Sequence, residues 1–251
     1  MSKLEAEFGE TDYKILSRES GFAGFLKVDI LKLKHRLFEG GWSAEINREI
    51  MVREGAVGVL LFDPKRDEIV LVRQFRVGLL NQIKTPWALE LVAGMANLGE
   101  DLDQVAMREV KEETNCGVSK LIRICDYFNS PGISSEKVRL YLGIMDSENA
   151  GGVYGLDKEN EDIEVVVLPY DEAMCGLNNG FLANAMSIIA LQWLELNKFN
   201  ILKDLFGHRI KINPGSGKDE GSLTAAYKYI RYQIVEALIK DMDKDETEAT
   251  F

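Results

Sequence analysis

The chain has 251 residues, of which 46% are hydrophobic, and a formal net charge of −11. This length and composition allow a sizeable core in one large domain or two small ones. The negative charge argues against nucleic acid or an anionic membrane surface as a partner. No apolar run approaches the roughly 18 residues of a membrane span, and residues 1–10 have no apolar signal core, so we expect a cytoplasmic protein.

The cysteines and histidines do not form a recognisable metal or disulfide pattern. Cys116, Cys125 and Cys175 contain no C-x-x-C pair and are odd in number, which predicts free buried thiols in a reducing compartment. His35 and His208 stand alone. Because zinc sites need clustered His or Cys, the sequence does not indicate zinc chemistry.

The first predicted elements in chain order are strands. After a loose start over residues 1–10, stretches such as 25–33 and 44–52 alternate between apolar and polar residues. This alternation is typical of strands in a half-exposed antiparallel sheet. We therefore place an N-terminal β region at residues 1–54.

A mixed α/β pattern follows over residues 55–200. Residues 56–62 and 68–75 predict two strands joined by the turn "DPKRD", and "WALELVAG" (87–94) predicts one strand that runs into a helix. This order of elements predicts helices packed on a sheet. Further strands are expected near 119–128, 137–145 and 163–168, and further helices near 170–176 and 182–197.

The last fifth of the chain differs in character, and we treat residues 201–251 as a C-terminal extension. "NPGSGKDEGS" (213–222) has the composition of a linker, and its "GSGK" lacks the Ser or Thr and the earlier glycine of a phosphate-binding loop. Residues 223–240 carry apolar side chains at helical spacing. They predict an amphipathic helix that docks on the body or on a second subunit, before a disordered acidic end.

The helix after residue 94 has recognisable ends. Asp101 is a plausible N-cap, and Asn115 followed by Cys116 and Gly117 supplies a left-handed stop. The helix should therefore run from about Leu102 to about Thr114.

Two glutamates lie on the apolar face of this helix. On a helical wheel Glu109 and Glu113 fall between Val105 and Val110, inside the stripe that should be buried. A solvated charged face explains Lys111 in the same run, but two like charges one turn apart should repel, and buried carboxylates need a cationic partner. Such a pair suits a hard divalent cation such as Mg²⁺, which takes oxygen ligands and keeps waters for a phosphate.

The stretch 94–116 resembles the Nudix box, G-x5-E-x7-R-E-U-x-E-E-x-G-U, in which U is a bulky apolar residue. One position departs from the motif, because Asn115 replaces its last glycine; asparagine tolerates the left-handed conformation, so the helix stop should survive. The matching positions are Gly94, Glu100, Arg108, Glu109, Val110, Glu112 and Glu113.

The resemblance extends from about residue 12 to about residue 200 and is strongest to bacterial Nudix members that hydrolyse ADP-ribose. Within "SPGISSE" (130–136), Pro131 stands at the downstream position typical of those members. "GLDKENEDIEV" (155–165) is similar to their catalytic loop, and "NAMSIIALQWL" (184–194) to their closing helix. The resemblance implies an α/β/α sandwich, to which the sequence pattern adds a small N-terminal antiparallel sheet and, beyond about residue 202 and outside the resemblance, an extra C-terminal helix.

The resemblance also implies roles for individual residues. It implies that Mg²⁺, or Mn²⁺, binds as two or three ions, that Arg108 orients the carboxylates with Glu112 close by, and that Glu159 is the catalytic base. In such relatives the N-terminal sheet is exchanged across a homodimer. The implied metal ligands are Glu109, Glu113, Glu161 and the Ala93 carbonyl; the implied substrate contacts are Phe25, Arg48 and Arg53 from the partner, and Arg76, Met95, Ser130 and Glu136 from the main domain.

The expected reaction is hydrolysis of ADP-ribose to AMP and ribose 5-phosphate. Another nucleoside diphosphate sugar, such as GDP-mannose, remains an alternative substrate, because motifs do not reveal the contacts to the sugar. A regulator that binds ADP-ribose without turnover is a further alternative. It predicts eroded metal carboxylates and an added basic DNA-binding region, whereas this sequence has intact carboxylates and an acidic tail.

Overall fold

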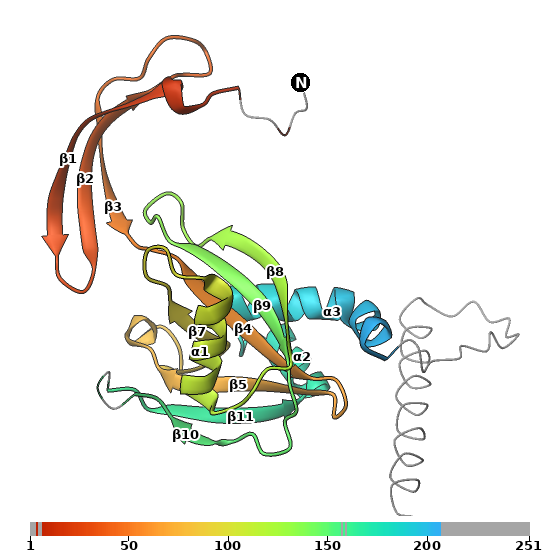
Figure 1. Ribbon diagram of the computed structural model, residues 1–251. Helices are drawn as coiled ribbons and strands as arrows, with labels where there is room; N and C mark the ends of the chain where they lie inside the picture. The colour runs from red at the N-terminus through yellow and green to blue at the C-terminus, as the bar shows by residue number, and fades with distance from the viewer. Residues whose placement is uncertain (1–3, 5–6, 157, 159, 207–251) are drawn as a thin grey trace, which may run out of the picture.

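The structure is a computed structural model that describes residues 4, 7–156, 158 and 160–206. After a short 3-10 helix, η1 (Glu10–Asp12), strands β1 (Tyr13–Ala23), β2 (Lys27–His35) and β3 (Ile46–Val52) form an antiparallel sheet in that order. This sheet stands away from the rest of the molecule (Figure 1). The antiparallel N-terminal sheet predicted from the sequence is thereby confirmed.

The body of the molecule is built on a second, mixed sheet. Its main path runs β10-β11-β5-β4-β9-β8, while β6 pairs with β5 and β7 pairs with β4. Only the pairing of β4 with β9 is parallel among the described strands. The strands are β4 (Ala56–Asp63), β5 (Glu68–Phe75), β6 (Trp87–Glu90), β7 (Val92–Met95), β8 (Lys120–Phe128), β9 (Lys137–Ile144), β10 (Gly152–Tyr154) and β11 (Ile163–Pro169).

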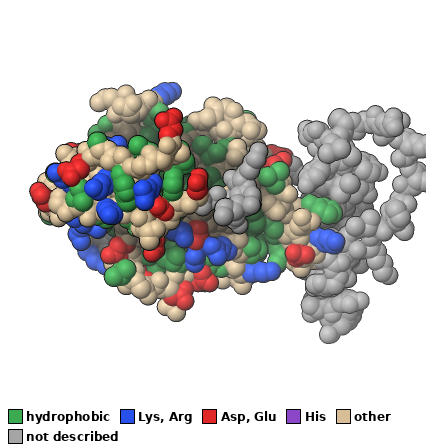
Figure 2. All heavy atoms as spheres, turned by 90° about the horizontal axis from the view of Figure 1, so that it is seen from above, with side chains coloured by type: hydrophobic (Ala, Val, Ile, Leu, Met, Phe, Trp, Pro, Cys, Tyr) green, Lys and Arg blue, Asp and Glu red, His purple; other side chains and the backbone are tan. Residues whose placement is uncertain are grey.

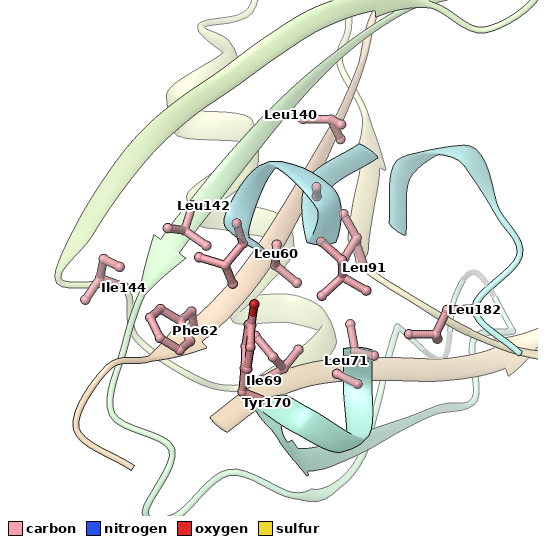
Figure 3. Close-up of a cluster of buried hydrophobic side chains, with 14 of the residues drawn as sticks. Leu60, Phe62, Ile69, Leu71, Leu91, Leu140, Leu142, Ile144, Tyr170 and Leu182 are labelled. Carbon is pink, nitrogen blue, oxygen red and sulfur yellow. The ribbon is translucent and has the colours of Figure 1, made fainter. Parts of the chain in front are cut away.

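Helices cover both faces of this sheet, which is why every residue of β4 is buried. On one face Leu60 and Phe62 pack in a cluster with Leu191 of α3 (Ala185–Phe206) and Tyr170 of α2 (Tyr170–Asn178) (Figure 3). On the other face the alternate residues of β4 pack against α1 (Leu102–Thr114). Two apolar layers on one sheet make the α/β/α sandwich that was expected.

The stretch 87–94 differs from the prediction, because it forms two strands instead of one. Glu90 pairs with Val72 of β5, whereas Val92 pairs with Val59 of β4. Leu91, between them, is buried in the core at 1% exposure. The apolar run therefore hides a crossing from one neighbouring strand to another, which periodicity alone does not reveal.

Other elements differ in length or were not predicted. Helix α3 ends at Phe206, later than expected, because Ile201 and Leu202 continue its buried side. The short elements η2 (Val77–Leu79) and β10 were not predicted. The predicted helix at 223–240 and the acidic end lie outside the described residues.

The three cysteines are free, as expected, but the prediction that they are buried was wrong. Cys175 is exposed on α2, and Cys116 and Cys125 are partly exposed. None of the helices in the described part of the chain is long and apolar enough to cross a membrane.

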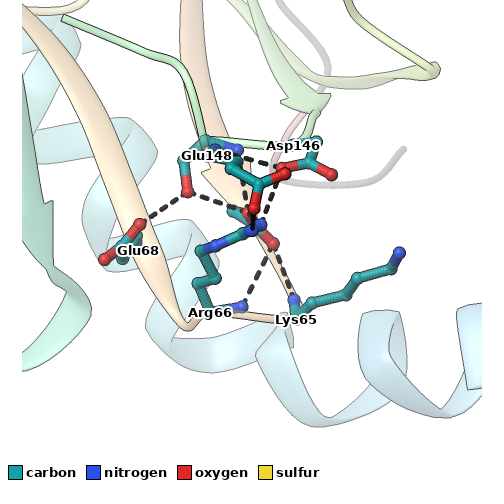
Figure 4. Close-up of polar contacts among 7 residues, drawn as sticks. Lys65, Arg66, Glu68, Asp146 and Glu148 are labelled. Atoms are coloured by element: carbon teal, nitrogen blue, oxygen red, sulfur yellow. Dashed lines mark hydrogen bonds and ion pairs between the residues drawn. The ribbon is translucent and has the colours of Figure 1, made fainter. Parts of the chain in front are cut away.

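A buried carboxylate fixes the turn that follows β4. Asp63 is fully buried and accepts hydrogen bonds from the main-chain N–H groups of Lys65 and Arg66 at 2.8 and 3.2 Å. It also accepts from the hydroxyl of Ser147 at 2.8 Å, while Arg66 pairs with Asp146 at 2.6 Å (Figure 4). This network confirms the predicted turn between β4 and β5.

A second ionic cluster joins β8 to β9. The carboxylate of Asp126 accepts from Arg139 at 2.7 and 2.9 Å and lies 3.0 Å from Arg123 and 3.2 Å from Lys137. Its side chain is 12% exposed. The hydrogen bonds from Arg139 hold the pKa of Asp126 well below its usual range.

We predict that Asp126→Asn destabilises the protein in a pH-dependent way. Because the pKa of Asp126 is lowered on folding, its contribution is present above the ordinary Asp pKa and is lost as the pH falls through the folded value. The variant should lose about 2 kcal/mol at pH 7, where a buried pair is broken. The gap between the thermal melts of the two proteins should narrow as the pH falls below the ordinary Asp pKa, and a gap that is the same at pH 7 and at pH 2 would contradict this.

Candidate active site

Helix α1 carries the first part of the site and has the predicted ends. The side chain of Asp101 accepts from the N–H groups of Asp103 and Gln104 at 2.8 and 3.4 Å, which caps the first turn. Asn115 ends the helix with a φ of 54°, the left-handed conformation expected where it replaces a glycine. The helix packs against β7 through the face that bears Glu109 and Glu113.

Glu113 is a carboxylate in the core. It is 3% exposed, and its Oε2 accepts from the N–H of Ala93 in β7 at 3.4 Å. Burial, together with the nearby charges of Glu109 and Glu161, raises the pKa of Glu113 to about 8, although the Ala93 N–H and Arg76 act in the opposite direction. The ionised form of Glu113 is therefore disfavoured unless a cation joins the site.

Glu109 lies directly against the backbone of β7. A Cβ atom on Gly94 would fall 1.9 Å from Cδ of Glu109 and 2.1 Å from its Oε1. Only a glycine leaves room for this carboxylate. The Glu109 side chain is 13% exposed and lies 2.9 Å from Nη2 of Arg108.

Arg108 bridges two of the helix carboxylates. Its Nη1 donates to Oε2 of Glu112 at 3.1 Å, in addition to the contact with Glu109. The Arg108 side chain is 44% exposed, so it approaches the cluster from the solvent side. This geometry suits the orienting role implied for Arg108.

A second glycine makes room for Glu161. Gly155 has a φ of +115°, and a Cβ atom on it would fall 2.7 Å from Cβ of Glu161. Oε2 of Glu161 accepts from the N–H of Leu156 at 3.1 Å. We did not single out Gly155 from the sequence, although it begins the loop stretch quoted above. Glu159, the implied base, lies outside the described residues.

The donors at this site fit a hard cation. Within the described part of the chain, no three Asp, Glu, His or Cys side chains converge closely enough to hold an ion as they stand. The charges of Glu109 and Glu161 nevertheless act on Glu113, and Ala93 adds main-chain polar groups beside Glu113. Carboxylate and carbonyl oxygens are ligands that suit Mg²⁺ or Mn²⁺. Binding of such an ion would remove the repulsion between the carboxylates.

Arg53, Phe25 and Met95 meet at the junction between the two sheets. The Arg53 guanidinium lies 5.1 Å from the Phe25 ring centre, and its Nη1 is 2.9 Å from Sδ of Met95. Nε of Arg53 is buried, and no described residue hydrogen-bonds to it. These three residues thus lie together within one chain. That Phe25 and Arg53 contact the substrate of a partner subunit stays a prediction.

The loop between β8 and β9 joins the same junction. The N–H of Met51 donates to the carbonyl of Ile133 at 2.8 Å, and the hydroxyl of Ser135 donates to the Arg53 carbonyl at 2.9 Å. The structure places the predicted residues Ser130 and Glu136 in this loop.

Arg48 does not join the group at the junction. It is exposed on β3, and its guanidinium donates to the carbonyl of Asn47 at 2.8 Å. The charge of Arg76 opposes the rise in the pKa of Glu113, and its Nε donates to Glu90 at 2.6 Å. Sequence reasoning missed Glu90 and Asn184, which contacts it, because no motif links them.

A sequence model of the NUDIX domain matches residues 52–203. The chain belongs to the Nudix family. It is 42% identical over 194 residues to the ADP-ribose pyrophosphatase of Escherichia coli K12, which covers 77% of this chain and 93% of that protein. It is 32% identical over 155 residues to the GDP-mannose pyrophosphatase of Cronobacter sakazakii, over 59% of this chain and 78% of that protein.

A solved structure supports the Nudix fold independently. The crystal structure of an ADP compounds hydrolase aligns with 75% of this chain and 96% of that chain, with a TM-score of 0.59 and 22% sequence identity. At this identity the likeness concerns the fold. Helix α1 contains five of the seven matching positions of the Nudix box, all between Arg108 and Glu113.

We predict that Gly94→Ala weakens metal binding without unfolding the protein. The new methyl group would displace the Glu109 carboxylate from β7, while the φ of Gly94 does not require glycine. Mn²⁺ affinity, measured by calorimetry, should fall at least 10-fold, in the range typical of disturbed metal shells. Gly117→Ala, where nothing lies within 4 Å, is the matched control. Equal Mn²⁺ affinity in both variants would refute the role given to Gly94.

Proposed function

We propose that this protein is a metal-dependent Nudix hydrolase that cleaves the diphosphate of ADP-ribose, giving AMP and ribose 5-phosphate. The observation that carries the proposal is the buried carboxyl of Glu113 beside Glu109 and Glu161, whose ionised form is disfavoured unless a cation joins it. The 42% identity to an ADP-ribose pyrophosphatase over 93% of that protein supports the substrate.

The carboxylates would hold the metal and the arginines would meet the substrate. Glu109, Glu113, Glu161 and the Ala93 carbonyl are the proposed ligands, and Arg108 orients Glu109 and Glu112. Bound there as two or three ions, Mg²⁺ or Mn²⁺ would neutralise the diphosphate and stabilise negative charge on the leaving phosphate.

Glu159 is the proposed general base. A carboxylate engaged with a cation accepts a proton poorly, so a further carboxylate has to take the proton of the attacking water. Glu159 belongs to the acidic stretch 155–165, which is similar in sequence to the catalytic loop of relatives that hydrolyse ADP-ribose.

The junction of the two sheets is the proposed site for the adenosine and phosphates. The unsatisfied Nε of Arg53 is a buried donor that an anionic ligand would satisfy, and Phe25, which is 80% exposed, offers a ring face. In the proposed dimer Phe25, Arg48 and Arg53 would reach the site of the other subunit. Its main domain would add Arg76, Met95, Ser130 and Glu136.

We further propose that the protein acts as a homodimer through its N-terminal sheet. Tyr13, Ile15 and Phe22 of this sheet are 50–59% exposed in the single chain. Figure 2 shows hydrophobic side chains at the surface among charged ones. A three-stranded sheet with so little cover gains stability from a second subunit, which supports exchange of residues 1–54 between subunits.

The extension and the compartment are also part of the proposal. We place a Nudix domain at residues 55–200 and an extension at 201–251, whose helix docks on the body or on the partner. The three free thiols are consistent with a cytoplasmic protein.

A panel of nucleoside diphosphate sugars tests the proposed reaction. With Mg²⁺ present, ADP-ribose should give the highest kcat/KM and yield AMP and ribose 5-phosphate, identified by mass spectrometry. Glu113→Gln should lower kcat by at least roughly 100-fold, because it removes a charged ligand, with circular dichroism unchanged. A preference for GDP-mannose would support the alternative substrate, whereas tight binding of ADP-ribose without turnover would support a regulator.

A pair of substitutions in the acidic loop tests the base. Glu159→Gln keeps size and hydrogen bonding but cannot accept a proton at neutral pH, so kcat should fall roughly 10²–10⁴-fold. Its Mg²⁺ dependence should stay unchanged, whereas Glu161→Gln should shift the Mg²⁺ titration to higher concentration. If Glu159→Gln turns over within a few-fold of the parent, another carboxylate, Glu112 or Glu161, takes the proton.

A further inference from the structure

Three side chains connect helix α3 to the carboxylate cluster. Nδ2 of Asn184 donates to Oε1 of Glu90 at 3.2 Å, and Nε of Arg76 donates to Oε2 of the same carboxylate at 2.6 Å. The Glu90 side chain is 14% exposed. Both of its oxygens therefore have a partner, and the short contact with Arg76, whose side chain is 40% exposed, is of the charge-assisted kind.

The helix holds the first of these side chains in one orientation. Oδ1 of Asn184 accepts from the N–H of Ser187 at 2.8 Å, and its carbonyl accepts from the N–H of Ile188 at 3.1 Å. Since Oδ1 is used as an acceptor by the helix, Nδ2 is the group that faces Glu90. The start of α3 also favours a nearby negative charge through the helix dipole.

Arg76 is fixed at two points and leaves one end available. Its main-chain N–H donates to the carbonyl of Pro86 at 2.8 Å, where β5 meets β6. Its guanidinium is held by Glu90 through Nε, and no described residue hydrogen-bonds to either Nη atom. Glu90, which holds the guanidinium, stands three residues before Ala93, whose N–H donates to the proposed metal ligand Glu113. Two Nη groups in a fixed plane are suited to a phosphate.

We propose that Glu90 and Asn184 are positioning residues that aim the Nη groups of Arg76 at the substrate diphosphate. The inference rests on the proposed function and adds two residues to its machinery. Without Glu90, Arg76 would lose the contact that holds its plane, and it would be drawn toward the negative cluster around Glu113. The substrate would then have to order this side chain when it binds, which would lower its affinity.

A double-mutant cycle tests whether Glu90 acts through Arg76. Arg76→Ala removes the binding group and should lower kcat/KM roughly 100-fold. Glu90→Ala only misplaces that group and should lower kcat/KM about 10-fold. The loss should appear mainly as a higher KM, because the contact is made before the chemical step. In the Arg76→Ala background, Glu90→Ala should change kcat/KM by less than about 2-fold, since the two residues act as one unit.

Two further variants separate positioning from stability. Asn184→Ser keeps a good helix N-cap but is too short to reach Glu90, so it should retain the melting temperature and raise KM about 3-fold. Glu90→Gln keeps one acceptor for Arg76 and should recover most of the Glu90→Ala loss. Asp146→Ala, which removes a 2.6 Å pair with Arg66 at the other end of β4, should leave KM unchanged.

The outcomes distinguish this inference from the proposed function. Additive losses from Arg76→Ala and Glu90→Ala, or an unchanged KM in Glu90→Ala, would overturn the positioning role while leaving the hydrolase intact. If the parent hydrolyses ADP-ribose poorly, the proposed function fails, and the cycle is repeated by calorimetry with inorganic diphosphate and Mg²⁺. The same non-additive pattern in affinity would then support the positioning role, and independent losses would refute it.

Discussion

The structure depends on one electrostatic constraint, which is the burial of a carboxylate beside two others. Glu113 is almost fully buried, and burial together with Glu109 and Glu161 raises its pKa to about 8. An isolated protein gains nothing from such an arrangement, because repulsion and desolvation both oppose folding. A bound cation would offset both costs. The free-energy cost of burying these carboxylates without metal would therefore be recovered as affinity for the cation.

Much of the surrounding fold serves to place these carboxylates. Gly94 leaves room for Glu109 to lie against β7. Gly155 leaves room for Glu161, which comes from the segment before β11. The crossing of the chain at Leu91 puts Glu90 beside β5 and Ala93 beside β4 within four residues. One short stretch therefore contributes both to the proposed metal site and to the side chain that contacts Arg76.

The features that the sequence predicted correctly are local features of the chain. Asp101 and Asn115 mark both ends of α1, and the position of Glu109 and Glu113 on its apolar face follows from helical spacing. Contacts between distant segments were not predictable in this way. The Glu90–Asn184 hydrogen bond joins residues 94 positions apart, and the room that Gly155 leaves for Glu161 depends on a positive φ. Such features arise from packing, which periodicity and spacing do not encode.

The central claim is that Glu109, Glu113 and Glu161 form a divalent-cation site, and a crystal soaked with Mn²⁺ tests it most directly. Anomalous difference maps report the position of the ion without relying on activity or on a substrate. The account predicts Mn²⁺ peaks at coordinating distance from the carboxylates of Glu109 and Glu113, absent from crystals of Glu113→Gln. Peaks elsewhere on the protein, or none at these carboxylates in crystals at saturating Mn²⁺, would contradict it.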